Sequence, residues 1–188
     1  MQELKERIIK DGIVIGDDIL KVDSFINHQI DTDLLDKICK FFSSKFSGVN
    51  KVLTIEASGI AYGIGTARYY NNCPMVFAKK SKSKTVDDNV YKTVIKSFTR
   101  GTESVVTVNN KYLNKGDKIL IVDDFLAEGN AALGLIDLCR QAGAEVVGVA
   151  IVIEKGFQGG RKKLEDLGIK VVSAAIIDRF ENGKVIMK

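Results

Sequence analysis

Short, mostly apolar runs recur along most of this sequence and restrict the folds open to it. Between them, small and apolar residues occur at helical spacing, as at about 60–70 and 131–141. An unbroken apolar run is typical of a strand covered on both faces, as in a parallel sheet between helices. The strand-like runs are 51–55, 75–78, 105–108, 118–122, 146–153 and 169–177. We therefore predict an α/β fold with a doubly wound, mostly parallel sheet and helices on both faces.

Residues that start and end helices support this division. Asp31 or Thr32 can cap a helix whose apolar residues continue at helical spacing to Phe46, with Gly48 after it. Gly143 follows the helix expected at about 131–141. The chain has 188 residues, about the length of one domain, and shows no internal repeat. We predict a single domain over residues 1–188.

Composition excludes several classes of protein. With 45% hydrophobic residues and a net charge of +4, disorder is not expected. No apolar run approaches the roughly 20 residues of a membrane-spanning helix, and the charged N-terminus does not resemble a signal peptide. We therefore expect a cytoplasmic protein that does not bind a membrane. Its small net charge suits a phosphorylated substrate but does not indicate nucleic acid.

Cysteine and histidine are too few for most metal and nucleophilic sites. Cys39, Cys73 and Cys139 form no CxxC pair, and His28 is the one histidine. A zinc site is therefore not expected, and the cysteines are predicted to be free thiols in a reducing compartment. Hydrolase mechanisms that need Ser–His or Cys–His pairs are excluded unless His28 is the base.

Two segments interrupt the alternation of strands and helices. Residues 12–30 are irregular, and residues 79–104 form a long polar stretch between two strands, with a run of lysines. That stretch is compatible with a solvated loop or with a flexible lid over a binding site. Ligands of open parallel sheets bind beyond the carboxyl ends of the strands, where we expect 56–59, the start of the lid and 123–131 to meet.

The most informative stretch is 119–131, in which four apolar residues precede Asp123 and Asp124, and a loop of mostly small residues then leads into a helix. Backbone N–H groups at a helix start bind anions, whereas two aspartates would repel a bare phosphate. Aspartates can face hydroxyl groups or a developing positive charge, so a phosphorylated sugar fits both parts of the motif. The pair could equally end a strand and cap the next helix, and spacing alone leaves both interpretations open.

A strand, two aspartates, a loop of small residues and a helix also make up the motif that binds 5-phosphoribosyl 1-diphosphate (PRPP) in type I phosphoribosyltransferases. The sequence resembles this family over essentially its whole length. Within the family it is most similar to the xanthine-specific branch, because of its N-terminal segment and Glu154-Lys155. The segments that carry the resemblance are 20–30, 54–61, 122–127 and 151–158.

The resemblance implies a purine-salvage enzyme that transfers the phosphoribosyl group of PRPP to xanthine, giving xanthosine 5′-monophosphate and pyrophosphate. It implies a homodimer, and Mg2+ bound mainly through PRPP with no metal ligand assigned in the chain. Asp123 and Asp124 would contact the ribose hydroxyls and stabilise an oxocarbenium-like transition state. The 5′-phosphate would be held by backbone N–H groups of Ala127, Glu128, Gly129, Asn130 and Ala131.

The resemblance assigns the pyrophosphate to a loop and to the lid. Ala57 and Ser58 would line its pocket, in a loop where related enzymes often have a cis peptide bond, although Ser58 could instead cap a helix. Lys80, on the lid, would neutralise the leaving pyrophosphate. A closed lid would exclude water, because an oxocarbenium-like centre would otherwise be hydrolysed.

The purine base would be recognised by Leu20, Asn27 and Lys155. Leu20 would contact the purine face, Asn27 can both donate and accept hydrogen bonds, and Lys155 would donate to an exocyclic oxygen. The alternatives are ordinary core packing for Leu20 and a solvent-directed side chain for Lys155.

The sequence also departs from the family pattern. Its phosphate loop lacks the threonines of many relatives, and Glu128 brings a negative charge, so either this side chain points outward or the phosphate is held less tightly. Phe98-Thr99-Arg100-Gly101 stands where adenine-specific members carry Leu-Glu-Tyr-Gly, which argues against adenine. Hypoxanthine or guanine as the base, and a non-catalytic PRPP-binding regulator, are the alternatives to a xanthine-specific enzyme.

Overall fold

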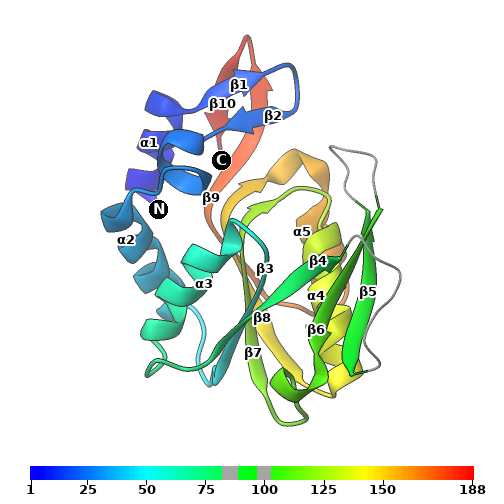
Figure 1. The fold of residues 1–188 in the computed structure, drawn as a ribbon. Coiled ribbons are helices and arrows are strands. Elements are labelled where there is room, and N and C mark those ends of the chain that lie inside the picture. The colour runs from blue at the N-terminus through cyan, green and yellow to red at the C-terminus, as the bar shows by residue number, and fades with distance from the viewer. Residues whose placement is uncertain (82–88, 97–102) are drawn as a thin grey trace.

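A computed structural model of the protein describes residues 1–81, 89–96 and 103–188 (Figure 1). The helices are α1 (Gln2–Asp11), α2 (Thr32–Ser43), α3 (Gly59–Arg68), α4 (Asn130–Ala142) and α5 (Gly160–Glu165). The strands are β1 (Ile13–Ile15), β2 (Ile19–Lys21), β3 (Lys51–Ile55), β4 (Met75–Ser81), β5 (Val90–Lys96), β6 (Glu103–Asn109), β7 (Lys118–Leu126), β8 (Glu145–Lys155), β9 (Val171–Glu181) and β10 (Lys184–Met187). Short helical turns are η1 (Asp23–Asn27), η2 (Asn110–Tyr112) and η3 (Gly156–Gln158).

A sheet of eight strands forms the centre of the described structure, in the order β10-β9-β8-β7-β3-β4-β6-β5. The inner strands β9, β8, β7, β3 and β4 are parallel, and the sheet is extended at its edges by three antiparallel pairings, β10 with β9, β6 with β4 and β5 with β6. Every residue of β3 is buried, as are residues 148–155 of β8, which explains the unbroken apolar runs. The predicted mostly parallel α/β sheet is confirmed.

Two apolar cores lie on opposite faces of the sheet (Figure 1). On one face, α2 and α3 contribute buried side chains such as Ile38, Phe42 and Tyr62. On the other face, α4 and α5 contribute Leu135 and Leu164. The prediction that helices cover both faces is therefore confirmed, and the carboxyl ends of the parallel strands remain open at one edge.

Residues 12–30, which we expected to be irregular, contain regular structure. β1 and β2 form an antiparallel hairpin apart from the main sheet, and the π-helical turn η1 follows it. The hairpin lies beside β10 near both chain termini (Figure 1). The expectation was wrong because strands of three residues are too short for a hydrophobic period to be recognised.

The helix after Asp31 is shorter than predicted. Asp31 is its N-cap, and a carboxylate oxygen accepts a hydrogen bond from the backbone N–H of Leu34 at 3.1 Å. α2 ends at Ser43, so Phe46 and Gly48 lie in the following loop. Phe46 is nevertheless buried in the same core as the helix, and this burial from the loop imitated a continued helical spacing.

Part of the segment 79–104 belongs to the sheet, which corrects the prediction of one long loop outside the core. Residues 79–81 extend β4, and Val90–Lys96 form β5. Ile95 is buried and packs on α4 at Gly134, where an added Cβ would lie 2.6 Å from Ile95 Cδ1. Residues 82–88 and 97–102, which include Lys82, Lys84 and the stretch 98–101, lie outside the described residues. The flexible lid therefore stays a prediction.

The three cysteines are free, as predicted. Burial raises the pKa of the Cys39 thiol to about 11 and that of the Cys139 thiol to about 12, which keeps both protonated and unreactive. In the ranges 1–81, 89–96 and 103–188, no helix is long and apolar enough to cross a membrane.

Candidate active site

The acidic pair lies within a strand that extends past its neighbour. β7 continues through Asp123 and Asp124, paired with β8, whereas its pairing with β3 ends at Ile121. The next helix, α4, has Gly129 at its N-cap and therefore no side chain to cap it. The alternative in which the aspartates cap this helix is wrong, and both residues line a cavity instead.

Asp123 is the more buried carboxylate of the pair, with 7% of its surface exposed. Its Oδ1 accepts a hydrogen bond from the backbone N–H of Asp124 at 3.0 Å. Burial, and then the charge of Asp124, raise the pKa of Asp123 well above its ordinary value. Asp124 is half-buried, and its Oδ2 accepts a hydrogen bond from Asn27 Nδ2 at 3.2 Å. The two carboxylates thus have different environments.

The loop after β7 presents its backbone to the same cavity. Gly129 has a φ of 83°, in the left-handed region that favours glycine, and α4 begins at the next residue. The first backbone N–H groups of a helix have no partner within it, so they are available to an anion. All five residues of the predicted phosphate loop line the cavity: Ala127, Glu128, Gly129, Asn130 and Ala131.

The cavity has a volume of about 600 Å³ and opens at the carboxyl ends of β3, β4, β7 and β8. This is the edge where an open parallel sheet binds its ligands. The structure brings together the three segments that were expected to meet there. Besides the loop, the predicted site residues that line the cavity are Asn27, Ala57, Ser58, Lys80, Asp123, Asp124 and Lys155.

Leu20 is the predicted site residue that the structure does not bring to this cavity. It lies in β2, has 7% of its surface exposed and packs in the core that α1 and α2 share. Its position matches the core-packing alternative. A contact between Leu20 and the purine stays a prediction.

The loop between β3 and α3 lies against the start of the predicted lid. The peptide bond between Glu56 and Ala57 is cis. Glu56 Oε1 accepts a hydrogen bond from the backbone N–H of Lys80 at 2.5 Å. Ser58 occupies the N-cap position of α3, yet its side chain makes no capping hydrogen bond. The helix-cap alternative for Ser58 is therefore not supported, and Ser58 lines the cavity.

Lys155 ends β8 and is buried, with 8% of its surface exposed. Its Nζ donates to the backbone carbonyl of Asp18, in the turn between β1 and β2, so it connects the N-terminal hairpin to the cavity. Burial lowers the pKa of Lys155. An ammonium group has three donors, so this contact leaves others for a ligand. The alternative of a solvent-directed Lys155 is wrong.

Glu128 does not leave its charge unpaired beside the phosphate loop. Its Oε2 lies 2.7 Å from Nζ of Lys163 on α5, and the same Nζ donates to the Glu128 carbonyl at 3.0 Å. The carboxylate is thus directed toward α5. Sequence reasoning did not find Lys163, because a pairing across 35 residues leaves no local signal.

Ten other cavity residues were assigned no role from the sequence: Ile55, Glu56, Ile95, Lys96, Ser104, Val106, Phe125, Leu126, Ala132 and Gln158. Gln158 is notable because its Oε1 is buried and has no hydrogen-bond partner among the described residues. A buried polar atom without a partner is expected to bind water or a ligand. The position of Gln158, three residues after Lys155, is the one clue that the sequence offered.

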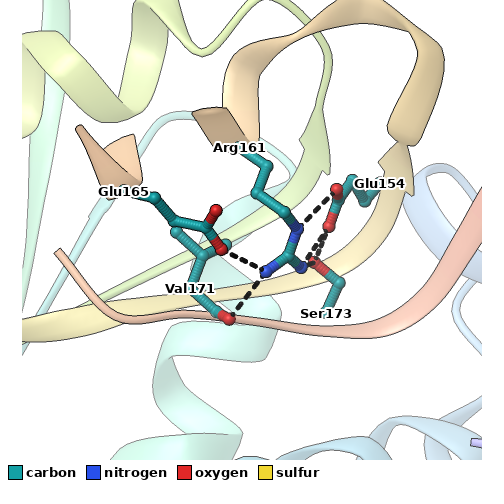
Figure 2. Close-up of polar contacts among 5 residues, drawn as sticks. All are labelled: Glu154, Arg161, Glu165, Val171 and Ser173. Carbon is teal, nitrogen blue, oxygen red and sulfur yellow. Dashed lines mark hydrogen bonds and ion pairs between the residues drawn. The ribbon is translucent and has the colours of Figure 1, made fainter. Parts of the chain in front are cut away.

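Glu154, next to Lys155, is held by a two-point ion pair with Arg161 of α5 (Figure 2). Arg161 Nε and Nη2 lie 2.8 and 2.6 Å from its two carboxylate oxygens. Ser173 Oγ also donates to Glu154, and Arg161 Nη1 donates to Glu165 and to the Val171 carbonyl. Such bidentate pairs are geometrically specific, so α5 is fixed against the carboxyl end of β8 and the amino end of β9.

Comparison with known proteins agrees with this geometry. The family model described as "Phosphoribosyl transferase domain" matches residues 28–183. The chain belongs to the phosphoribosyltransferase family. Xanthine phosphoribosyltransferase from Clostridium novyi (strain NT) is 54% identical over the full length of both chains. Xanthine phosphoribosyltransferase 2 from Clostridium botulinum (strain Hall) is 53% identical over both full lengths, and the Streptococcus pneumoniae (strain Hungary19A-6) enzyme is 52% identical over all of this chain and 98% of its own.

Solved phosphoribosyltransferase structures share the fold. Adenine phosphoribosyltransferase from Giardia lamblia, complexed with 9-deazaadenine, has a TM-score of 0.75 at 20% identity and covers 92% of this chain and 96% of its own. The Rhodothermus marinus enzyme has a TM-score of 0.73 at 23% identity, with 94% and 99% covered. At these identities the likeness concerns the fold alone.

Proposed function

We propose that this phosphoribosyltransferase transfers the 5-phosphoribosyl group of PRPP to xanthine, giving xanthosine 5′-monophosphate and pyrophosphate. The bond from ribose C1 to the pyrophosphate oxygen breaks, and its electron pair leaves with pyrophosphate. A bond from C1 to a purine nitrogen forms as that nitrogen loses its proton. The supporting observation is one cavity that joins an acidic pair, a helix N-terminus and a buried lysine, in a chain 52–54% identical to xanthine phosphoribosyltransferases.

In this proposal Asp123 and Asp124 bind the ribose hydroxyls. Positive charge develops at C1 as the bond to pyrophosphate breaks, and a nearby carboxylate stabilises it. Asp123 is suited to this because it is buried and already positioned by the Asp124 backbone N–H. Groups that are fixed before the reaction do not have to reorganise during it.

The two phosphate groups are assigned to two loops. Backbone N–H groups at the start of α4 hold the 5′-phosphate, as is common at helix N-termini. Ala57 and Ser58 line the pyrophosphate side, and Lys80 supplies positive charge there, since both segments face the cavity. Movement of a lid over this side would exclude water.

The base is assigned to the wall formed by Asn27, Lys155 and Gln158. Lys155 donates to an exocyclic oxygen of xanthine, and Asn27 turns an amide toward the same cavity. Xanthine carries one more oxygen than hypoxanthine, and guanine has an amino group at that position. Because an unsatisfied buried donor costs about 1–3 kcal/mol, this wall favours xanthine by roughly tenfold to a hundredfold.

Mg2+ is proposed to enter with PRPP. Within the described ranges, no group of three or more His, Cys, Asp or Glu side chains is arranged to hold a metal ion. Mg2+ commonly binds through one or two carboxylates together with substrate phosphates and water. Asp123, Asp124 and Glu56 line the cavity, and one or two of these carboxylates would suffice for an ion held mainly by substrate phosphates. When bound, the ion would neutralise charge on the pyrophosphate.

The proposal includes a single domain over residues 1–188, a homodimer and a cytoplasmic location. Light scattering coupled to size exclusion tests the dimer, and a monomer at micromolar concentration would contradict it.

Purified protein should be assayed with PRPP, Mg2+ and each purine base in competition. Xanthosine 5′-monophosphate as the main product supports the proposal. Preference for hypoxanthine or guanine would reassign the base, and PRPP binding without turnover would indicate a regulator.

A further inference from the structure

Helix α5 contacts the phosphate loop through its first residue and through Lys163. The backbone N–H of Gly160 donates to the Ala127 carbonyl at 3.0 Å. The absence of a side chain at Gly160 permits this approach, since an added Cβ would lie 2.8 Å from the Gly129 nitrogen. The path of the loop backbone is therefore matched to the position of α5.

Lys163 adds a charged contact to this packing. Its ammonium group binds both the carboxylate and the carbonyl oxygen of Glu128, at 2.7 and 3.0 Å. The side chains of Lys163 and Glu128 are 45% and 29% exposed, so the pair is partly shielded from solvent. Lys162, the preceding residue, is instead 80% exposed and pairs with Asp166 within the helix.

The helix that carries Lys163 is itself anchored. Arg161 binds Glu154, whose side chain is 3% exposed, in the bidentate pair of Figure 2. Arg161 also binds the Val171 carbonyl at 3.1 Å. α5 is thus fixed to the ends of β8 and β9, so Lys163 reaches the loop from a defined position.

We propose that Lys163 is a positioning residue for PRPP, because it neutralises Glu128 and holds the phosphate loop in a form that accepts the 5′-phosphate. This inference rests on the proposed function of the site. A phosphate approaching the start of α4 would otherwise meet the negative charge of Glu128. The pair converts a carboxylate that would repel the ligand into a tether for the loop.

The test is calorimetric binding of PRPP with Mg2+, and of ribose 5-phosphate, to Lys163→Gln and to the control Lys162→Gln. The two substitutions remove the same charge from adjacent positions of one helix. We expect the dissociation constant of Lys163→Gln to rise about fivefold at low ionic strength, as for one uncompensated charge near a phosphate in a mostly aqueous setting. In 1 M KCl the screening length is about 3 Å. Under these conditions the dissociation constant of Lys163→Gln should be less than about twofold higher than that of Lys162→Gln.

Two further variants test whether Lys163 acts through its positive charge or only through its packing. Lys163→Arg should bind within about twofold of wild type, and Glu128→Gln should restore binding in the Lys163→Gln background. KM for PRPP should rise in Lys163→Gln while kcat stays within about twofold of wild type. If Lys163→Gln does not fold, Glu128→Gln alone still tests the inference. This variant should bind PRPP at least as tightly as wild type.

Three results would overturn the inference: equal affinities for the two lysine variants, a defect that persists in 1 M KCl, or no restoration by Glu128→Gln. Weaker PRPP binding by Glu128→Gln alone would overturn it as well. Wild-type protein that binds neither PRPP nor ribose 5-phosphate would refute the proposed function instead, so the two failures are distinguishable.

Discussion

Replacing Asp123 by asparagine should slow the transfer reaction and, at neutral pH, make the folded protein more stable. The carboxylate is 7% exposed, and among the described residues it has no ion-pair partner within 4.0 Å. Burial of a carboxylate costs several kcal/mol, of which its hydrogen bond from Asp124 offsets a part. Asparagine has nearly the same shape and retains an oxygen to accept that hydrogen bond.

The gain in stability should depend on pH in a defined direction. Burial raises the pKa of folded Asp123 above its ordinary value of 3.8, so protonation favours the folded state. This stabilising contribution is fully present below the unfolded pKa and is lost as the pH rises through the folded pKa. Asp123→Asn should therefore match wild type near pH 4. At pH 8 it should exceed the wild-type free energy of unfolding by about 1–3 kcal/mol, a rise in Tm of roughly 2–12 °C.

The assays are thermal unfolding from pH 4 to 8 and turnover with PRPP and xanthine. Turnover should fall on the order of 10²–10³-fold, as for loss of one preorganised charge contact in the transition state. Asp178→Asn removes a half-exposed carboxylate from β9 and should change neither quantity appreciably. A variant less stable than wild type at pH 8, or a stability difference independent of pH, would refute the burial argument. Near-normal turnover would refute the electrostatic role.

Four further substitutions test two residues of the cavity and two residues of α5. Lys155→Ala should lower kcat/KM for xanthine about tenfold or more while PRPP binding changes little, and Asn27→Ala should narrow the preference for xanthine over hypoxanthine, both measured by competition between bases. Gly160→Ala should weaken PRPP binding in calorimetry, because its Cβ would press on the phosphate-loop backbone. Arg161→Met should lower the free energy of unfolding by about 2–4 kcal/mol in denaturant titration, since it leaves Glu154 buried without its partner; an unchanged midpoint would contradict this.

Much of the fold could be predicted because its central strands are buried on both faces. Their mostly apolar runs stand out in the sequence, as at residues 119–122 of β7, and the acidic pair that follows this run remains in the same strand. β5 was missed although Tyr91, Thr93 and Ile95 alternate with more exposed residues. Its neighbouring lysines suggested a solvated loop, whereas the inward face packs on α4. Tertiary contact with a glycine of that helix, rather than local composition, determines the structure there.

The candidate site also has one part that could be predicted from the sequence and one part that could not. The acidic pair and the phosphate loop are contiguous in the sequence, so their motif was visible without the structure. The residues that surround them come from other elements: Asn27 lies beside Asp124, Lys163 lies beside Glu128, and Gln158 lines the same cavity. No period or spacing links such residues, because they meet only when α5 and the N-terminal segment fold against the sheet.

The carboxylates around the cavity differ in the ion pairs and hydrogen bonds that they receive from the protein. This difference affects which of them can contribute to catalysis. Glu128 is paired with Lys163, Asp124 accepts a hydrogen bond from Asn27, and Glu56 accepts one from the Lys80 backbone. Asp123 accepts its neighbour's N–H but has no ion pair within 4.0 Å among the described residues, and burial raises its pKa. A carboxylate already satisfied in the ground state gains little when positive charge develops. Asp123 gains most at that moment, and an interaction that strengthens only in the transition state is the kind that raises kcat.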